Sequence, residues 1–171
     1  MVGGAIPKNF IPAIEKGVLE TMENGPLVGC TVERVRVSVH DGKYHSVDSS
    51  EMAFKIAGRM AFREAVSQAK PVLLEPVMHV DVHIPDACTG DVTGDLNHKR
   101  GRILGMSMEE GMEVVSAEVP YAEMRKYATE LRSMTQGRGS FEMNFVRYEP
   151  VPPNVAAEII AAHQSEVTAE A

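Results

Sequence analysis

Hydrophobic residues recur along the first part of this chain with two different periods. Over Pro7–Asn24 they are spaced by three or four residues, which predicts a helix that Asn24-Gly25-Pro26 ends. Over Thr31–His40 valines alternate with polar residues, which predicts a half-buried strand. The strand runs into Asp41-Gly42, a pair typical of tight turns, so a hairpin-like tip is expected there.

A second helix is predicted from Asp48 to about Gln68. Asp48 is a suitable N-cap, and Glu51 three residues later completes a capping-box pattern. Two adjacent apolar rows follow, and together they predict a wide face that packs on a sheet. The rows are Met52, Ile56 and Met60, and Ala53, Ala57, Ala61 and Ala65.

From Val72 onward, strand and helix patterns succeed one another in the order β-α-β-β-α-β. This order is the split βαβ, or ferredoxin-like, arrangement. The predicted strands are Met78–Ile84, Arg102–Met108, Met112–Pro120 and Ser140–Tyr148. The predicted helices are Gly90–Lys99 and Tyr121–Met134, the latter presenting Met124, Ala128 and Leu131. Prolines at 150, 152 and 153 then precede a short helix at Asn154–Ala162.

The fold class is therefore α+β, with a mixed sheet-and-helix segment at 1–71, a ferredoxin-like domain at 72–149 and a C-terminal helix and tail at 150–171. One strand cannot satisfy its own backbone donors and acceptors. Residues 1–71 therefore either borrow strands from elsewhere or are the remainder of a larger domain, and we expect the second. The exposed sheet edge of this segment would allow a non-physiological dimer.

Composition limits the possible functions. The 171 residues are 44% hydrophobic and 24% charged, and no apolar run approaches the length of a membrane span. Cys30 and Cys88 have no CxxC spacing, so reduced thiols and a cytoplasmic protein are expected. The net charge of −7 argues against a broad phosphate-binding surface, so any RNA-binding role requires local basic clusters.

The sequence contains neither a GxxxxGK[ST] phosphate-binding loop nor a GxSxG nucleophile elbow, so neither nucleotide nor hydrolase chemistry is supported. A metal enzyme built on His79, Asp81 and His83 is an alternative, because period 2 places these side chains on one strand face. Same-face neighbours stand about 7 Å apart, however, and rarely converge on one ion. A solvent-facing polar side of the sheet is the simpler interpretation.

Two loops carry candidate RNA-binding groups. At Asp41, Gly42, Lys43, Tyr44 and His45, a cation, an aromatic ring and an imidazole stand together and could contact a phosphate, a base face and a 2′-hydroxyl. Around 133–139, Arg132 and Arg138 flank a glycine-containing loop that could approach a phosphate. A further basic cluster is His98, Lys99, Arg100 and Arg102. Ordinary polar turns and solvated helix ends would show the same composition.

Four segments closely resemble domains IV and V of bacterial elongation factor G. They are DGKYHSVDSSEMAFK at 41–55, PVLLEPVM at 71–78, GDVTGDLN at 90–97 and YATELRSMTQGRG at 127–139. The likeness runs in register from about residue 3 to about residue 161.

The resemblance implies that residues to about 71 are the back of domain IV, that 72–149 are domain V, and that the last helix packs on domain IV. It implies that the tip with His45 reaches the 16S decoding region and helps to move tRNA and mRNA. It also implies that Arg132, Ser133, Gln136 and Arg138 contact the sarcin–ricin loop and the GTPase-associated region of 23S rRNA.

On this resemblance the chain is not an enzyme and holds no cofactor, whereas GTP and magnesium belong to the full-length parent, a translational GTPase. Whether that parent is the translocase or a recycling or ribosomal-protection relative stays open. The alternative from another class is a small-ligand-binding regulatory module, because ferredoxin-like domains often serve as effector sensors.

Overall fold

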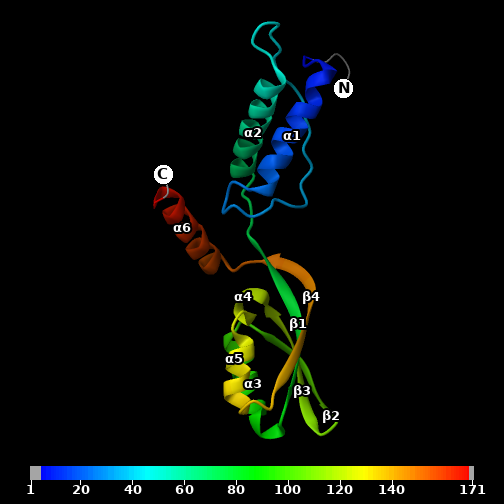
Figure 1. Cartoon of the computed structure of the whole chain (residues 1–171), viewed down its shortest axis with the longest axis vertical. Coiled ribbons are helices and arrows are strands. Elements are labelled where there is room, and N and C mark those ends of the chain that lie inside the picture. Colours follow the sequence, from blue (N-terminus) through cyan, green and yellow to red (C-terminus); the bar gives the residue numbers. More distant parts are fainter. Residues whose placement is uncertain (1–4, 170–171) are drawn as a thin grey trace. The chain divides into compact units, whose positions relative to one another are not determined.

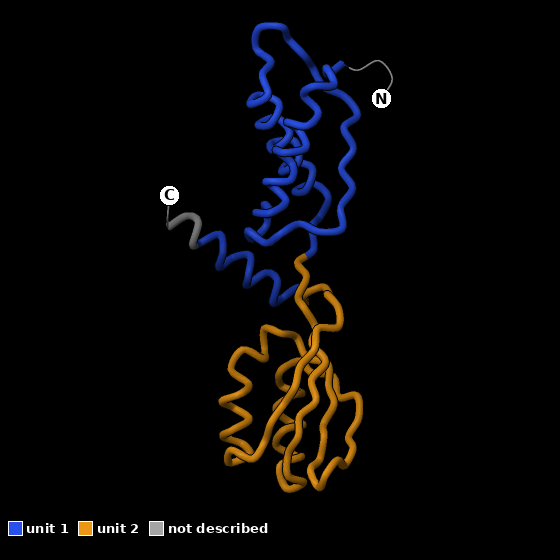
Figure 2. The backbone as a smooth tube through the Cα atoms, turned by 45° about the vertical axis from the view of Figure 1, so that its right-hand side comes forward, with its two compact units in different colours: residues 1–72, 153–171 blue, residues 73–152 orange. Residues whose placement is uncertain are grey.

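The computed structural model describes residues 5–169, with side chains up to residue 165. The chain divides into two compact units, residues 1–72 with 153–171 and residues 73–152, which Figure 2 shows in different colours. None of the described helices is both long and apolar enough to cross a membrane.

The second unit is a four-stranded antiparallel sheet with helices on one face (Figure 1). Its strands lie in the order β2-β3-β1-β4, so the first strand lies inside the sheet between the third and the fourth. This arrangement confirms the predicted β-α-β-β-α-β domain. The elements are β1 (Leu74–Ile84), η2 (Asp86–Cys88), α3 (Thr89–His98), β2 (Arg102–Glu109), β3 (Met112–Pro120), α4 (Tyr121–Met124), α5 (Tyr127–Thr135) and β4 (Ser140–Pro150).

The core of the second unit lies between one sheet face and the helices. Alternate residues of β1 and β3 point into it, and α3 and α5 supply the opposite side. The fully buried side chains include Val80, Val82, Ile84, Val92, Leu96, Val115, Val119 and Leu131. Each such burial stabilises the fold by about 1.5–3 kcal/mol relative to an exposed side chain. This core holds the 125–138 region in place.

The predicted helix at Tyr121–Met134 is divided into α4 and α5. Lys126, with φ −113° and ψ 2°, leaves the helical region between them. Tyr127 faces the core instead of the predicted Ala128, which is exposed. The large aromatic side chain gains more from burial than the alanine methyl does.

The first unit contains η1 (Lys8–Phe10), α1 (Ile11–Glu23), α2 (Glu51–Gln68) and α6 (Pro153–Ala169). Both predicted N-terminal helices are present, and they lie side by side in Figure 1. The last helix continues beyond the predicted Ala162 to Ala169, through a sequence that contains neither glycine nor proline to end it.

The strand predicted at Thr31–His40 does not form. No described segment pairs with it, Arg34 within it has a left-handed φ of 58°, and Val35 and Val37 are 45% and 46% exposed. Alternation reports which faces of an extended segment are apolar, and a strand additionally needs a neighbour to accept its backbone hydrogen bonds. An apolar hollow of about 770 Å³ lies between this segment and helices α1 and α2.

Helix α2 also packs with a different face from the one predicted. Met52 and Met60 are 61% and 65% exposed, whereas Phe54, Gly58 and Phe62 face α1. A Cβ atom at Gly58 would lie only 2.9 Å from the backbone oxygen of Ile14. Because glycine allows this close approach, the two helix backbones meet there.

Candidate functional site

The first candidate site is the loop that joins the segment 31–40 to α2, drawn in cyan in Figure 1. The predicted hairpin at Asp41-Gly42 is not formed, because no strand pair flanks it. The chain reverses instead between His45 and Ser49. The amide of Ser49 donates to the carbonyl of His45 (3.1 Å), and the amide of His45 donates to Oγ of Ser49 (2.9 Å). We call residues 41–49 the tip loop.

The start of α2 fixes the end of the tip loop. Ser50, not the predicted Asp48, is the N-cap, and its hydroxyl accepts a hydrogen bond from the amide of Ala53. Asp48 instead lies beside His45, with 3.2 Å between Oδ2 and Nδ1. The signal for this contact in the sequence is the three-residue separation of a histidine and an aspartate within one turn.

His45 is presented to solvent, its side chain being 68% exposed. Both of its described contacts, with Asp48 and with the amide of Val47 (3.4 Å), engage Nδ1. Nε2 has no contact with the other described residues, so it is available to an external ligand. The local turn holds the ring in position without burying it.

Lys43 and Tyr44 complete the chemistry of the tip loop. The Tyr44 ring packs against Phe10 with centroids 5.9 Å apart, and Phe10 stacks on Phe54 at 4.7 Å. These contacts tether one side of the tyrosine and leave nearly half of it exposed. Lys43 is exposed and has no ion pair within the described part of the chain. A cation, a ring face and an imidazole thus lie within three consecutive residues.

The second candidate site is the end of α5 and the loop after it. Arg132 and Ser133 are exposed on the last turn, and Gln136 adopts the left-handed conformation with φ 54°. The amide of Gly137 donates to the carbonyl of Arg132 (2.8 Å), which closes the helix in a Schellman arrangement. Gly137 has φ +80° and open space beside it, so a ligand could approach its backbone.

Arg138 is only loosely held. Its Nε donates to the carbonyl of Thr135 at 3.3 Å, and the rest of the guanidinium has no described partner. The hydroxyl of Thr135 accepts a hydrogen bond from the amide of Gly139 (2.9 Å), and this contact fixes the end of the loop. The structure thus brings Arg132, Ser133, Gln136 and Arg138 together as exposed donors on one helix end. The two guanidinium groups can bind a phosphate in a bidentate manner, and the serine and glutamine side chains are neutral donors.

The predicted basic cluster at 98–102 is not free to bind an anion, because its cations are already paired. Lys99 lies 3.2 Å from Asp95 and 2.9 Å from Glu130, and Arg100 forms two hydrogen bonds with Glu75. Sequence composition does not reveal such pairing, because the carboxylate partners come from other elements of the fold.

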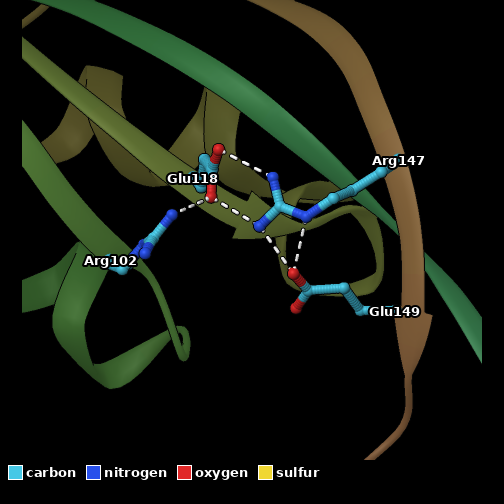
Figure 3. Close-up of polar contacts among 4 residues, drawn as sticks. All are labelled: Arg102, Glu118, Arg147 and Glu149. Atoms are coloured by element: carbon cyan, nitrogen blue, oxygen red, sulfur yellow. Dashed lines mark hydrogen bonds and ion pairs between the residues drawn. The ribbon is translucent and has the colours of Figure 1, made fainter.

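Arg102 belongs to an ion-pair network on the sheet face opposite the core (Figure 3). Glu118 on β3 accepts hydrogen bonds from Arg147 (2.8 and 2.7 Å) and from Arg102 (2.7 Å). Arg147, and then Arg102, lower the pKa of this carboxyl from 4.5 to about 2. Nothing in the spacing of the sequence indicated this network.

The metal alternative finds no support in the geometry. His79 Nε2 lies 3.2 Å from Asp81, and Asp81 accepts a hydrogen bond from Ser116 (2.5 Å). The described residues contain no group of three histidine, cysteine, aspartate or glutamate side chains placed to hold one ion. The row is a hydrogen-bonded polar stripe of the sheet.

The ligand-binding alternative requires a concave pocket between paired ferredoxin-like domains. Two hollows are described, of about 920 and about 770 Å³, and residues of the first unit line both of them. The larger lies beside Arg59, Arg63 and His163. Neither hollow lends support to a sensor built on the second unit.

Comparison with known families places the chain in the machinery of protein synthesis. The model described as elongation factor G, domain IV, matches residues 1–70, and the model described as elongation factor G C-terminus matches residues 72–159. The chain belongs to the elongation factor G family, which is a family of translational GTPases. The resemblance read from the sequence is thereby confirmed.

A solved structure supports the same assignment. A crystal structure of a protein from Thermus thermophilus superposes with a TM-score of 0.82 at 42% sequence identity. The similarity covers 96% of this chain and 25% of that protein. The chain therefore spans about a quarter of the length of the protein it resembles.

Proposed function

We propose that this chain is the ribosome-facing part of a translocase of the elongation factor G type. In this proposal the tip loop enters the 16S decoding region and contacts the tRNA–mRNA complex. The loop at 132–138 contacts the sarcin–ricin loop and the GTPase-associated region of 23S rRNA. The translocase, as opposed to a recycling or ribosomal-protection relative, is the parent that we favour.

The presentation of His45 is the observation that supports this proposal most strongly. The turn from His45 to Ser49 leaves the imidazole exposed, and the adjacent Tyr44 ring and Lys43 cation are exposed beside it. RNA is recognised through such stacking, hydrogen-bonding and phosphate contacts. A tip of this size can bind RNA although the chain carries a net charge of −7.

The energy for movement would come from elsewhere in a longer protein. The sequence contains no phosphate-binding loop, so in the proposal this chain is not itself an enzyme and binds no cofactor. GTP and magnesium would bind to the GTPase domain of the full-length factor, in the cytoplasm. The two units described here would convert that domain's state into contacts with RNA.

Chemical protection of ribosomal RNA tests the proposal directly. The chain is incubated with small ribosomal subunits, and reactivity of the 16S decoding region is mapped with and without it. We expect protection there, and we expect His45→Ala to weaken it. His163→Ala is the matched control, because this histidine lies near Gly29, beyond the other end of α1. Protection that is absent, or equally affected by both substitutions, would refute the role of the tip.

A further inference from the structure

The eight basic residues of the second unit fall into two groups of four. Lys99, Arg100, Arg102 and Arg147 are held in ion pairs with carboxylates. Arg125, Lys126, Arg132 and Arg138 form no ion pair within the described part of this unit. All four unpaired cations lie between residues 125 and 138, although the unit as a whole has thirteen acidic residues.

The acidic residues of the same region are paired with other cations. Residues 121–139 contain only Glu123 and Glu130. Glu123 accepts a hydrogen bond from Arg100 (2.9 Å), and Glu130 lies 2.9 Å from Lys99. Both carboxylates are therefore neutralised from the side of α3, and the outer side of α4 and α5 keeps an uncompensated positive charge.

One buried row runs through α4 and α5 and defines which side is outside. Its members, spaced by three or four residues, are Met124, Tyr127, Leu131 and Thr135. Arg125 and Arg132 each directly follow a member of this row, Met124 and Leu131, and both are exposed. Lys126 and Ser133, the next residues along the chain, are exposed as well. Figure 1 shows α4 leading directly to α5 on one face of the sheet.

We propose that the whole outer side of α4 and α5 binds the sugar–phosphate backbone of RNA, with Arg125 and Lys126 adding contacts to those of the 132–138 loop. This inference rests on the proposed function. Arginine binds phosphate through its fork of donors, and lysine acts as a point charge. Ser133 and Gln136 are neutral donors between the cations, suited to phosphate oxygens and 2′-hydroxyls.

The test uses the full chain and a synthetic RNA hairpin with the sarcin–ricin sequence, followed by fluorescence anisotropy from about 50 to about 200 mM salt. Arg125→Ala/Lys126→Ala is expected to weaken binding about tenfold and to reduce the slope of log affinity against log salt by roughly 1 to 2. Arg102→Ala is the matched control, because this arginine is 69% exposed but paired with Glu118. It should change affinity less than about twofold.

A third variant separates the two levels of the proposal. If Arg132→Ala/Arg138→Ala abolishes RNA binding while Arg125→Ala/Lys126→Ala leaves affinity and salt slope unchanged, the extended surface is wrong and the proposed function stands. If neither double variant changes RNA binding, the proposed contact of this unit fails as well. If the variant Arg125→Ala/Lys126→Ala still binds the RNA hairpin but no longer binds an acidic ribosomal protein, the surface is a docking site for protein, and the inference is overturned.

Discussion

Tyr127 shows what a single side chain contributes to the second unit. It is fully buried, its ring meets Phe141 edge to face at 5.1 Å, and its hydroxyl has no hydrogen-bond partner within the described residues. Burial, reinforced by Asp95 and Glu130, raises the pKa of this hydroxyl. The ring stabilises the core beneath α5, whereas the hydroxyl opposes burial.

Tyr127→Phe should therefore leave the protein equally stable or stabilise it by about 1 kcal/mol, because it removes an unpaired buried polar group and keeps the ring. Urea unfolding followed by circular dichroism measures the difference. Destabilisation by more than about 1 kcal/mol would mean that the hydroxyl is hydrogen-bonded, for example to an internal water.

Glu118 makes the stability of the sheet depend on pH. Its folded-state pKa, about 2, lies below its ordinary value of 4.5 because Arg147 and Arg102 donate to the carboxylate. A lowered folded-state pKa contributes stability that is present above about 4.5 and is lost as pH falls towards 2.

Glu118→Gln should consequently be less stable than the wild-type chain at neutral pH, and the difference should shrink as the pH falls between 4.5 and about 2. Urea unfolding at a series of pH values gives this comparison. A difference that stays constant over the range would show that the two arginines do not depend on the charge of Glu118.

At the scale of elements, the sequence predicted the second unit better than the first. All four strands of the ferredoxin-like sheet find partners inside the described chain, so the alternating pattern and the pairing agree. The segment 31–40 alternates just as clearly but has no partner there. Local periodicity predicts extension, and pairing depends on distant residues that a window of sequence does not contain.

Where two or more residues carry the same local signal, the sequence alone does not predict which of them the fold uses. Helix α2 has several apolar rows, and the close approach at Gly17 and Gly58 selects the one with Phe54. Both Asp48 and Ser50 can cap a helix, and Asp48 lies beside His45 instead. For the candidate sites, the sequence identified the exposed residues, but the turn that orients His45 and the ion pairs that occupy Lys99 and Arg100 needed the fold.

Packing of α1 on α2 depends on the absence of a side chain at the crossing. Gly58→Ala should destabilise the first unit by about 1–3 kcal/mol, because its Cβ would press on the backbone of Ile14. Gly94→Ala is the control, since this α3 glycine has open space beside it and alanine should stabilise the helix by about 0.5–1 kcal/mol. Thermal and urea unfolding compare the two variants. Equal effects of the two substitutions would contradict the close approach.

At the scale of the whole molecule, charge is distributed unevenly. The second unit carries eight basic and thirteen acidic residues, and the first carries nine and eleven. Most of the net charge of −7 therefore belongs to the ferredoxin-like unit. Such a body repels nucleic acid over most of its surface, so contacts with RNA have to be local.

Self-association of the whole molecule, which the sequence predicts, stays a prediction. The backbone of 35–39 has no strand partner within the described chain, and a second copy could pair with it antiparallel, so that Val35 meets Val39. Light scattering over a range of concentrations should show self-association that Val37→Lys abolishes and Val47→Lys does not. A monomer at all concentrations would contradict the expectation.

The most direct test of the account is a comparison of two rates in a full-length elongation factor G that carries this sequence as its C-terminal part. With His45→Ala we expect translocation to slow about tenfold, equivalent to about 1.4 kcal/mol of transition-state stabilisation, while single-round GTP hydrolysis on the ribosome stays nearly unchanged. Equal loss of both rates, or no loss of either, would contradict the role assigned to the tip loop.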